Sequence, residues 1–201
     1  MLDVDYHSGD GSENLFAKHF QGNEKLKLLN VVAAGWSEGG GDSREAWPGN
    51  RHTLCNKSVQ NVQRIRVPAS ANAQELTSAF ERALGWVKII DPKYVVLSLG
   101  FDFLQGDQGA QGSLSHFEQL GQGLGALGCR VVSILEGGYR VAEMQDACCC
   151  YLKALTSVTK PKYGLARHTI NARVVVNASD PVVPYRVKFV NLTAHKVIVG
   201  Q

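Results

Sequence analysis

The chain has 201 residues, 44% of them hydrophobic and 19% charged, with a formal net charge of +3. This size and balance are typical of a globular protein with one good-sized domain and a core. No apolar run is long enough for a membrane span, and the acidic start is unlike a signal peptide, so we expect an intracellular protein of the nucleus or cytoplasm with no membrane contact.

The first predicted element is an extended strand in which polar and apolar residues alternate from Asp3 to His7. Because successive side chains of a strand point to opposite faces, Asp3, Asp5 and His7 share one face. The Gly-Asp-Gly sequence at 9–11 predicts a turn after this strand. A carboxylate and an imidazole two residues apart at a strand end can hold one cation, so this segment is a candidate metal site.

Two further strands are predicted before the first helix. The apolar run Leu26–Ala34 is typical of a buried strand, and Val62–Val67 alternates as a short strand that ends at Pro68. Between them, the glycine-rich segment Gly35–Gly49 lacks the Lys-Ser/Thr of a phosphate-binding loop and does not open a helix. We interpret it as a flexible loop.

The first predicted helix begins at Asn72, whose side chain is suited to the N-cap, with Glu75 three residues later. The Asp91-Pro92 pair ends it. Apolar residues recur at helical spacing between these limits, which predicts one buried stripe. The stripe consists of Leu76, Phe80, Leu84 and Val87.

Strands and helices then alternate. The continuous apolar run Tyr94–Leu99 predicts a strand buried on both faces, and Arg130–Leu135 predicts the next buried strand. The segments Ser113–Gly128, which contains several glycines, and Val141–Leu155 have helical spacing. This alternation predicts an α/β fold built on a parallel sheet with flanking helices.

The pattern changes near residue 160. Residues 156–201 contain seven Lys or Arg and one Asp, a net charge of +6, whereas residues 1–155 have 14 basic and 17 acidic residues, a net charge of −3. The β-type runs Arg173–Val176, Tyr185–Val190 and Lys196–Val199 have no helix between them. We predict a domain at 1–160 and a β-rich basic tail at 161–201. Because the basic charges are dispersed, we do not expect direct nucleic-acid binding.

Unusual polar residues stand at three predicted strand ends. They are the Asp3–His7 segment, the Leu97–Asp102 segment and the Leu135–Tyr139 segment. Sites in parallel α/β sheets form beyond the carboxyl ends of strands, so these segments are expected to meet. Taken singly, a lone Asp after a strand is more often a cap than a ligand, and a Gly-Gly-Tyr sequence is more often a turn.

In this order, the three segments resemble motifs of the zinc-dependent histone deacetylase and acetylpolyamine amidohydrolase superfamily. The first resembles the family's Asp-x-Asp-x-His run, and the second its Ser-x-Gly-x-Asp segment, with Asp107 at a later Gly-Asp. The third is similar to its Glu-Gly-Gly-Tyr turn. The resemblance covers roughly residues 1–157 and implies an arginase/deacetylase-like sheet.

The resemblance also implies roles for individual residues. Asp5, His7 and Asp102 would be the ligands of Zn²⁺, and such a set leaves one coordination position open, as in catalytic zinc sites. Tyr139 would donate a hydrogen bond to the oxyanion. The implied reaction is hydrolysis of an acetylated protein at N-acetyl-lysine, or of an acetylated amine. Asp3 and Asp10 match carboxylates that orient a pair of catalytic histidines.

That pair is absent, because no His-His sequence occurs in the chain. In the family the pair belongs to the first half of the domain, so we expect that this chain begins in mid-domain and is impaired as an enzyme on its own. The other histidines, His116 among them, are interpreted as surface or capping residues. Arg140 stands where the family usually has Asn.

Three alternatives remain open. The chain is a non-catalytic relic that binds zinc or a partner, an arginase-like dimanganese hydrolase, or an α/β protein with chance motifs. Motifs needed for the arginase-like interpretation are not found in the sequence. Since an incomplete sheet exposes an edge and apolar surface, a protein partner that covers it is also expected.

Overall fold

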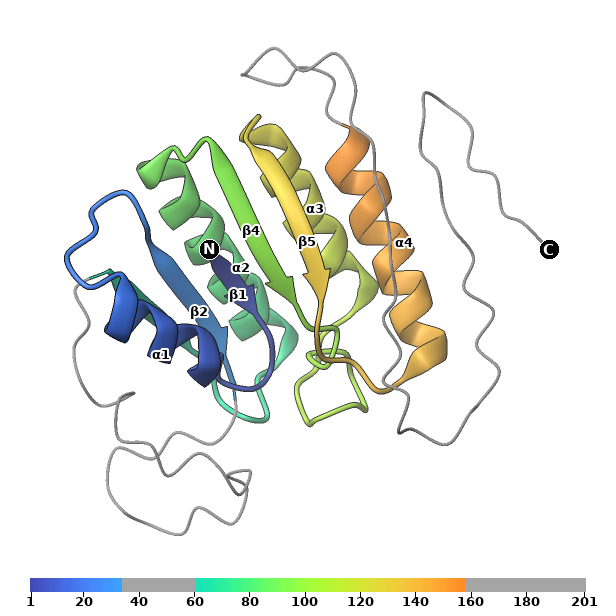
Figure 1. Cartoon of the computed structure of the whole chain (residues 1–201). Helices are drawn as coiled ribbons and strands as arrows, with labels where there is room; N and C mark the ends of the chain where they lie inside the picture. Colours follow the sequence, from blue (N-terminus) through green and yellow to red (C-terminus); the bar gives the residue numbers. More distant parts are fainter. Residues whose placement is uncertain (34–60, 158–201) are drawn as a thin grey trace, which may run out of the picture. The chain divides into compact units, whose positions relative to one another are not determined.

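The computed structural model describes residues 1–33 and 61–157 (Figure 1). The predicted loop Gly35–Gly49 and the predicted tail 161–201 lie outside these residues. Strands and helices alternate in the described part. In chain order the elements are β1 Leu2–Val4, α1 Asp10–His19, β2 Leu28–Val32, β3 Val62–Arg66, α2 Ala73–Ile90, β4 Tyr94–Leu99, α3 Leu114–Ala126, β5 Arg130–Leu135 and α4 Val141–Ser157.

The five strands form one parallel sheet in the order β3-β2-β1-β4-β5. Val4 of β1 is in register with Val31 of β2 and Leu99 of β4, and Leu99 is in register with Leu135 of β5. The chain therefore leaves β1, β4 and β5 at the same edge of the sheet. This confirms the predicted α/β fold with a parallel sheet and flanking helices.

One face of the sheet carries the main hydrophobic core. In Figure 1, α2 and α3 lie behind the sheet, and α4 packs beside α3. Leu97, Phe80 and Phe117 are buried in this core, and burying a side chain of this size stabilises a fold by about 1.5–3 kcal/mol. Gly121 of α3 lies so close to the backbone of Tyr151 in α4 that a β-carbon would overlap it. The packing of α3 against α4 therefore requires glycine at position 121.

The predicted helix starts are confirmed. Asn72 caps α2 through a capping box with Glu75, and Asp91 ends the helix in a left-handed conformation with φ of 48°. Ser113 caps α3 together with His116, whose Nδ1 accepts from the Ser113 N–H at 3.1 Å. His116 Nε2 lies 2.9 Å from the Ala73 carbonyl at the start of α2. His116 is thus a capping residue, but it is buried and ties the beginnings of two helices together.

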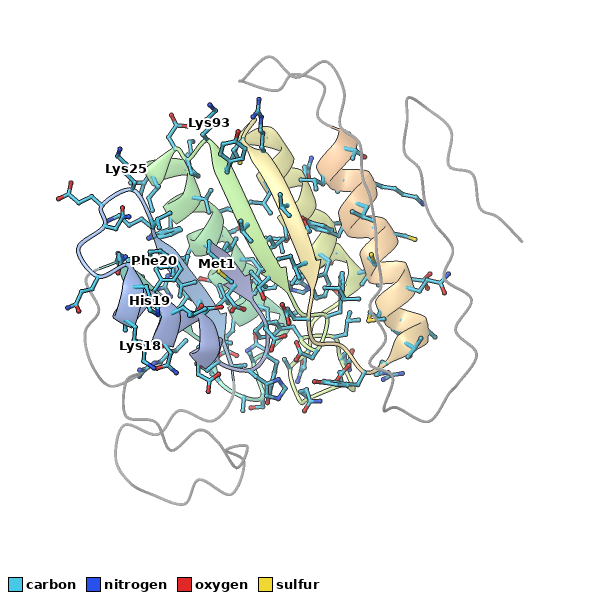
Figure 2. All side chains as sticks on the ribbon, in the orientation of Figure 1. Met1, Lys18, His19, Phe20, Lys25 and Lys93 are labelled. Carbon is cyan, nitrogen blue, oxygen red and sulfur yellow. The ribbon has the colours of Figure 1, made fainter. Side chains whose placement is uncertain are left out.

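The opposite face is partly covered by α1, in a segment where the sequence predicts only a turn. Phe16 of α1 packs against Leu28 and Val62. Met1 and Phe20, which are labelled in Figure 2, pack against this cluster. Gly9 at the N-cap offers no side-chain hydrogen bond, and the helix has only a narrow apolar stripe. These are weak signals, so the helix depends on tertiary contacts that the sequence alone does not reveal.

A buried polar network also anchors α1 to the sheet. The carboxylate of Glu13 is buried, accepts a hydrogen bond from Asn30 of β2, and forms an ion pair with Arg64 of β3. The Arg64 Nε donates to Glu13 Oε1 at 2.7 Å. Because a buried carboxylate is costly without a cationic partner, this pair fixes the position of α1 on β2 and β3.

Two details of the sheet differ from the prediction. The strand β1 is short, so Asp5 and His7 lie beyond its end and do not continue the alternation of Asp3. The strands β4 and β5 are not buried on both faces: Val96 and Val132 are exposed, Val132 by 55%. The described helices leave this part of the face uncovered (Figure 1).

Among the described residues, no helix has the length and hydrophobicity needed to cross a membrane.

Candidate metal centre

Asp5, His7 and Asp102 come together at the carboxyl edge of the sheet. One ligand atom from each of the three lies within 4.8 Å of the others. His7 Nδ1 is 3.1 Å from Asp102 Oδ2 and 3.4 Å from Asp5 Oδ1. The loop after β1 therefore meets the loop after β4, as expected for adjacent parallel strands with the same direction.

Backbone hydrogen bonds hold the two carboxylates in place. The Tyr6 N–H donates to Asp102 Oδ1 at 3.0 Å, and the His7 N–H donates to Asp5 Oδ1 at 2.8 Å. The Tyr6 ring is buried in the core, and its hydroxyl donates to the Ala69 carbonyl at 3.0 Å. Tyr6 thereby anchors the segment between the two candidate ligands.

Two glycines form the wall behind the carboxylates. A β-carbon on Gly100 or Gly137 would overlap the oxygen atoms of Asp5 and Asp102. The Gly137 N–H donates to Asp5 Oδ2 at 3.1 Å. Glycine at both positions thus allows the backbone to approach the carboxylates closely enough for direct contact.

The charges at the cluster favour a cation. Burial raises the pKa of Asp102, although hydrogen bonds from His7 and Tyr6 oppose this. Hydrogen bonds to Asp102 and Asp5 raise the pKa of His7 to about 10, so its imidazole balances the carboxylates as a cation. Two carboxylates and one imidazole are ligands that zinc accepts. These residues fit a divalent metal, which would supply the positive charge that the protonated ring otherwise provides.

The two carboxylates predicted to orient histidines are in different positions. Asp3 on β1 is 4% exposed, and burial, followed by the charge of Asp5, raises its pKa to about 7. Asp10 is the first residue of α1, where its charge favours the helix N-terminus. In the part of the chain that the structure describes, no hydrogen bond joins Asp10 to the cluster. That Asp3 and Asp10 orient a pair of histidines stays a prediction.

Tyr139 lies on the turn after β5, and the residue is 63% exposed. Partial burial and then the charges of Asp102, Asp5 and Asp107 raise the pKa of its phenol. The phenol is therefore in the same electrostatic environment as the cluster. A neutral phenol is the form that donates a hydrogen bond.

The family model for the histone deacetylase domain matches residues 1–155. This chain belongs to the histone deacetylase domain family. The chain is 25% identical, over 150 residues, to acetylpolyamine amidohydrolase 2 of Pseudomonas aeruginosa, and the match covers 72% of this chain and 40% of that protein.

Solved structures show the same fold. The acetylpolyamine aminohydrolase from Burkholderia pseudomallei superposes with a TM-score of 0.60 at 22% identity, over 78% of this chain and 44% of that one. The HD domain of HDA15 gives a TM-score of 0.61 at 21% identity, over 77% of this chain and 43% of that one. This histone deacetylase family chain thus spans less than half the length of these relatives.

Sequence reasoning misses the residues that support this cluster. The contacts of Gly100 and Gly137 with the carboxylates depend on how two loops meet, and only the glycines inside the two motifs hint at them. Asp107 matches a motif position to which the sequence assigns no role. In the structure its carboxylate accepts hydrogen bonds from the turn that carries Tyr139.

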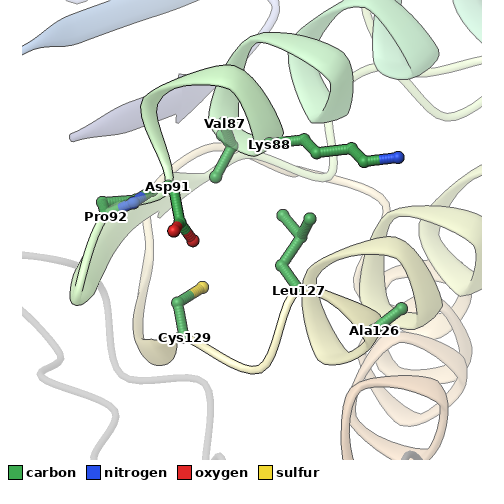
Figure 3. A pocket seen from close by; sticks show the side chains of 7 residues that line it. All are labelled: Val87, Lys88, Asp91, Pro92, Ala126, Leu127 and Cys129. Atoms are coloured by element: carbon green, nitrogen blue, oxygen red, sulfur yellow. The ribbon is translucent and has the colours of Figure 1, made fainter. Parts of the chain in front are cut away.

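A pocket also lies far from these residues. It is located between the ends of α2 and α3, where Figure 3 shows Asp91, Leu127 and Cys129 around it. These positions are close to the amino ends of β4 and β5, whereas the cluster is at the carboxyl ends. None of the candidate site residues lines this pocket, so it is separate from the candidate metal centre.

Proposed function

We propose that this chain carries the metal centre of a zinc-dependent deacetylase that acts on N-acetyl-lysine or an acetylated amine. The observation that supports the proposal is the cluster of Asp5, His7 and Asp102 at the carboxyl edge of the sheet. A family match over residues 1–155 supports deacetylase chemistry in particular. Similar relatives include two acetylpolyamine hydrolases, which supports an acetylated amine as a substrate class.

Each residue has a proposed task. Asp5, His7 and Asp102 would hold the metal, while the Tyr6 and Gly137 N–H groups keep the carboxylates oriented. Bound zinc supplies a Lewis acid that polarises an amide carbonyl and lowers the pKa of water. Tyr139 would donate a hydrogen bond to the acetyl carbonyl oxygen as negative charge develops on it.

This chain lacks the histidine pair that would transfer protons in the reaction. The 201 residues contain no His-His pair to remove a proton from water and deliver one to the leaving amine. General acid–base catalysis typically contributes about 10²–10⁴-fold to the rate. We therefore propose that the chain alone binds metal and turns over slowly at best.

Zinc content tests the metal centre. The purified protein is dialysed against zinc and then buffer, and bound zinc is measured by mass spectrometry for wild type, Asp102→Ala and Asp146→Ala. Asp146 is an exposed carboxylate on α4 and serves as the matched control. We expect about one zinc per chain in wild type and Asp146→Ala, and a large loss in Asp102→Ala. Equal zinc in all three proteins would disprove the site.

Hydrolysis of an acetyl-lysine peptide and of an acetylated polyamine tests catalysis. A zinc-dependent rate that falls in Tyr139→Phe would establish turnover. Zinc binding without any such rate would favour the second candidate, a non-catalytic protein that binds a partner.

The uncovered sheet face supports that second candidate. Val96 and Val132 are in register on neighbouring strands, as are Ser98 and Ile134, and Val96, Val132 and Ile134 are exposed. Parallel sheets are normally covered on both faces. A helix that runs antiparallel to β4 would place its positive end near Glu136 and its negative end near Lys93 and Arg130, which suits the helix dipole. We propose an amphipathic helix of a protein partner as the occupant.

The part of the Burkholderia acetylpolyamine aminohydrolase that has no counterpart here is a suitable probe. Produced as a separate polypeptide, it is expected to bind this chain in a titration, and Ile134→Asp is expected to abolish binding. Leu15→Asp, which changes an exposed leucine of α1, is the control. Unchanged binding of Ile134→Asp would rule out this face as the docking surface.

A further inference from the structure

We propose that Asp107 is a positioning residue that fixes the backbone of Tyr139, so that the phenol is presented to the metal centre. This inference rests on the proposed function, because it gives Tyr139 the role of oxyanion donor. It assigns a task to a carboxylate outside the metal cluster. The turn Gly137–Arg140, which carries the phenol, is held at both of its ends.

The first end of the turn is attached to the metal centre itself. The Gly137 N–H donates to Asp5 Oδ2 at 3.1 Å, and the Gly137 carbonyl accepts from the Phe101 N–H at 2.9 Å. Gly138 follows with φ of 121°, a conformation that residues with side chains rarely adopt. The turn therefore leaves the cluster through a hydrogen-bonded residue, followed by a position that requires glycine.

Asp107 holds the second end. Its Oδ2 accepts hydrogen bonds from the Tyr139 N–H at 2.7 Å and from the Arg140 N–H at 3.1 Å. The other oxygen, Oδ1, accepts from Gln108 Nε2 at 3.1 Å. The Asp107 N–H donates to the Leu104 carbonyl at 3.0 Å, so the carboxylate is itself held by its loop.

Arg140 provides a second link between the same two loops. Its Nη1 donates to the Gln105 carbonyl at 3.1 Å, and its guanidinium also pairs with Glu143. A β-carbon on Gly106 would overlap this guanidinium. The side chain of Arg140 thus lies against the loop that carries Asp107, and its charge is already balanced. Arg140 therefore contributes to the contact between the two loops.

The exposure of Tyr139 makes the backbone contact important. A buried ring is oriented by its neighbours, but Tyr139 as a residue is 63% exposed, so the direction of its ring depends on its backbone. Two hydrogen bonds to an ionised carboxylate are stronger than neutral ones and select one backbone conformation. A misplacement of about 1 Å in a reacting group can reduce a rate by about 100-fold. Asp107 therefore controls whether the phenol reaches the position of the oxyanion.

A double-mutant cycle on the zinc-loaded protein tests this role without requiring turnover. The probe is acetohydroxamate, a zinc chelator whose oxygens would accept a hydrogen bond from Tyr139 under the proposed function. Its affinity is measured by calorimetry for wild type, Tyr139→Phe, Asp107→Ala and the double variant. We expect each single variant to weaken binding by about 3–10-fold, as for loss of one hydrogen bond. The double variant should then be no weaker than Tyr139→Phe alone.

Controls separate positioning from damage to the fold. Zinc content should be unchanged in Asp107→Ala, and Asp107→Asn should restore most of the affinity because its amide oxygen still accepts. If Asp107→Ala does not fold, Asp107→Ser takes its place, since a shorter side chain cannot reach both N–H groups. Asp146→Ala again serves as the surface control.

The outcomes distinguish this inference from the proposed function. If Tyr139→Phe weakens binding but Asp107→Ala does not, only the role of Asp107 is wrong. That role is also wrong if the two losses add in the double variant, or if Asp107→Ala loses zinc. If Tyr139→Phe leaves the affinity unchanged, the proposed role of Tyr139 fails, and the inference fails with it.

Discussion

Replacement of Gly137 by alanine tests the metal centre without changing a ligand. In the structure, a β-carbon at this position would lie 2.5 Å from Asp5 Oδ2 and 2.8 Å from the Asp102 carboxyl carbon. Ordinary contacts of this kind are 3.4 Å or longer, so the carboxylates must shift by about 1 Å. Asp102 has no free space for that shift, because it is fully buried and bonded to the Tyr6 N–H.

A shift of this size is large for a zinc site, in which bonds to oxygen are about 2.0–2.2 Å. Loss of the supporting contacts of a metal ligand typically lowers metal affinity by about 10–100-fold. Since Gly137→Ala disturbs two ligands at once, we expect a loss at the upper end of this range. Gly137 does not have a positive φ, so the backbone itself accepts alanine.

The assay is a competition between the protein and a fluorescent zinc chelator. Gly85→Ala is the matched control, because apart from its chain neighbours and the backbone of its own helix no heavy atom lies within 4 Å of the position a β-carbon would take there. That variant should keep the zinc affinity of wild type and gain about 0.5–1 kcal/mol in free energy of unfolding, as expected for alanine within a helix. An unchanged zinc affinity in Gly137→Ala would refute the geometry of the cluster.

Three further predictions concern the fold. His116→Ala should lower the free energy of unfolding by about 2–4 kcal/mol in urea titrations, because it removes hydrogen bonds at the start of two helices; a loss below about 1 kcal/mol would contradict this link. Arg64→Ala should cost about 3–5 kcal/mol, since Glu13 stays buried without its ion pair, whereas Arg64→Ala combined with Glu13→Gln should recover part of the loss. Burial raises the pKa of the Cys148 thiol from 9.0 to about 11, so its contribution to stability is intact below pH 9 and decreases between about pH 9 and 11. Cys148→Ala should reduce this alkaline loss of stability. If the free energy of unfolding of the variant depends on pH as in wild type, the buried thiol is not its cause.

Local signals in the sequence predict the regular elements well where they are strong. The capping box of Asn72 and Glu75 and the stripe that includes Phe80 are encoded within one helix, and both occur as expected. The helix α1 carries no comparable signal. It is stabilised by Phe16 against the sheet and by the pairing of Glu13 with a strand 51 residues away. A contact between distant segments cannot be read from the spacing within either one.

The same distinction applies to the site. The order of the three motifs at strand ends predicts that Asp5, His7 and Asp102 meet, because parallel strands bring their carboxyl ends to one edge. The contribution of Asp107 depends on the path of the loop after β4, which turns back to meet the segment after β5. The exposure of Val132 likewise depends on which helices cover the sheet.

The arrangement of the metal centre separates metal binding from proton transfer. Asp5 and His7 follow β1, Asp102 follows β4, and Tyr139 follows β5, so adjacent strands of one sheet supply all the residues proposed to hold a metal and an oxyanion. These groups are positioned by contacts within residues 1–33 and 61–157. The groups that would move protons are not part of that framework. Zinc affinity should therefore respond to Gly137→Ala and Asp102→Ala even in a chain that hydrolyses nothing, whereas any turnover should depend on Tyr139 as well. Measuring binding and turnover on the same variants thus distinguishes an enzyme from a metal-binding relative of one.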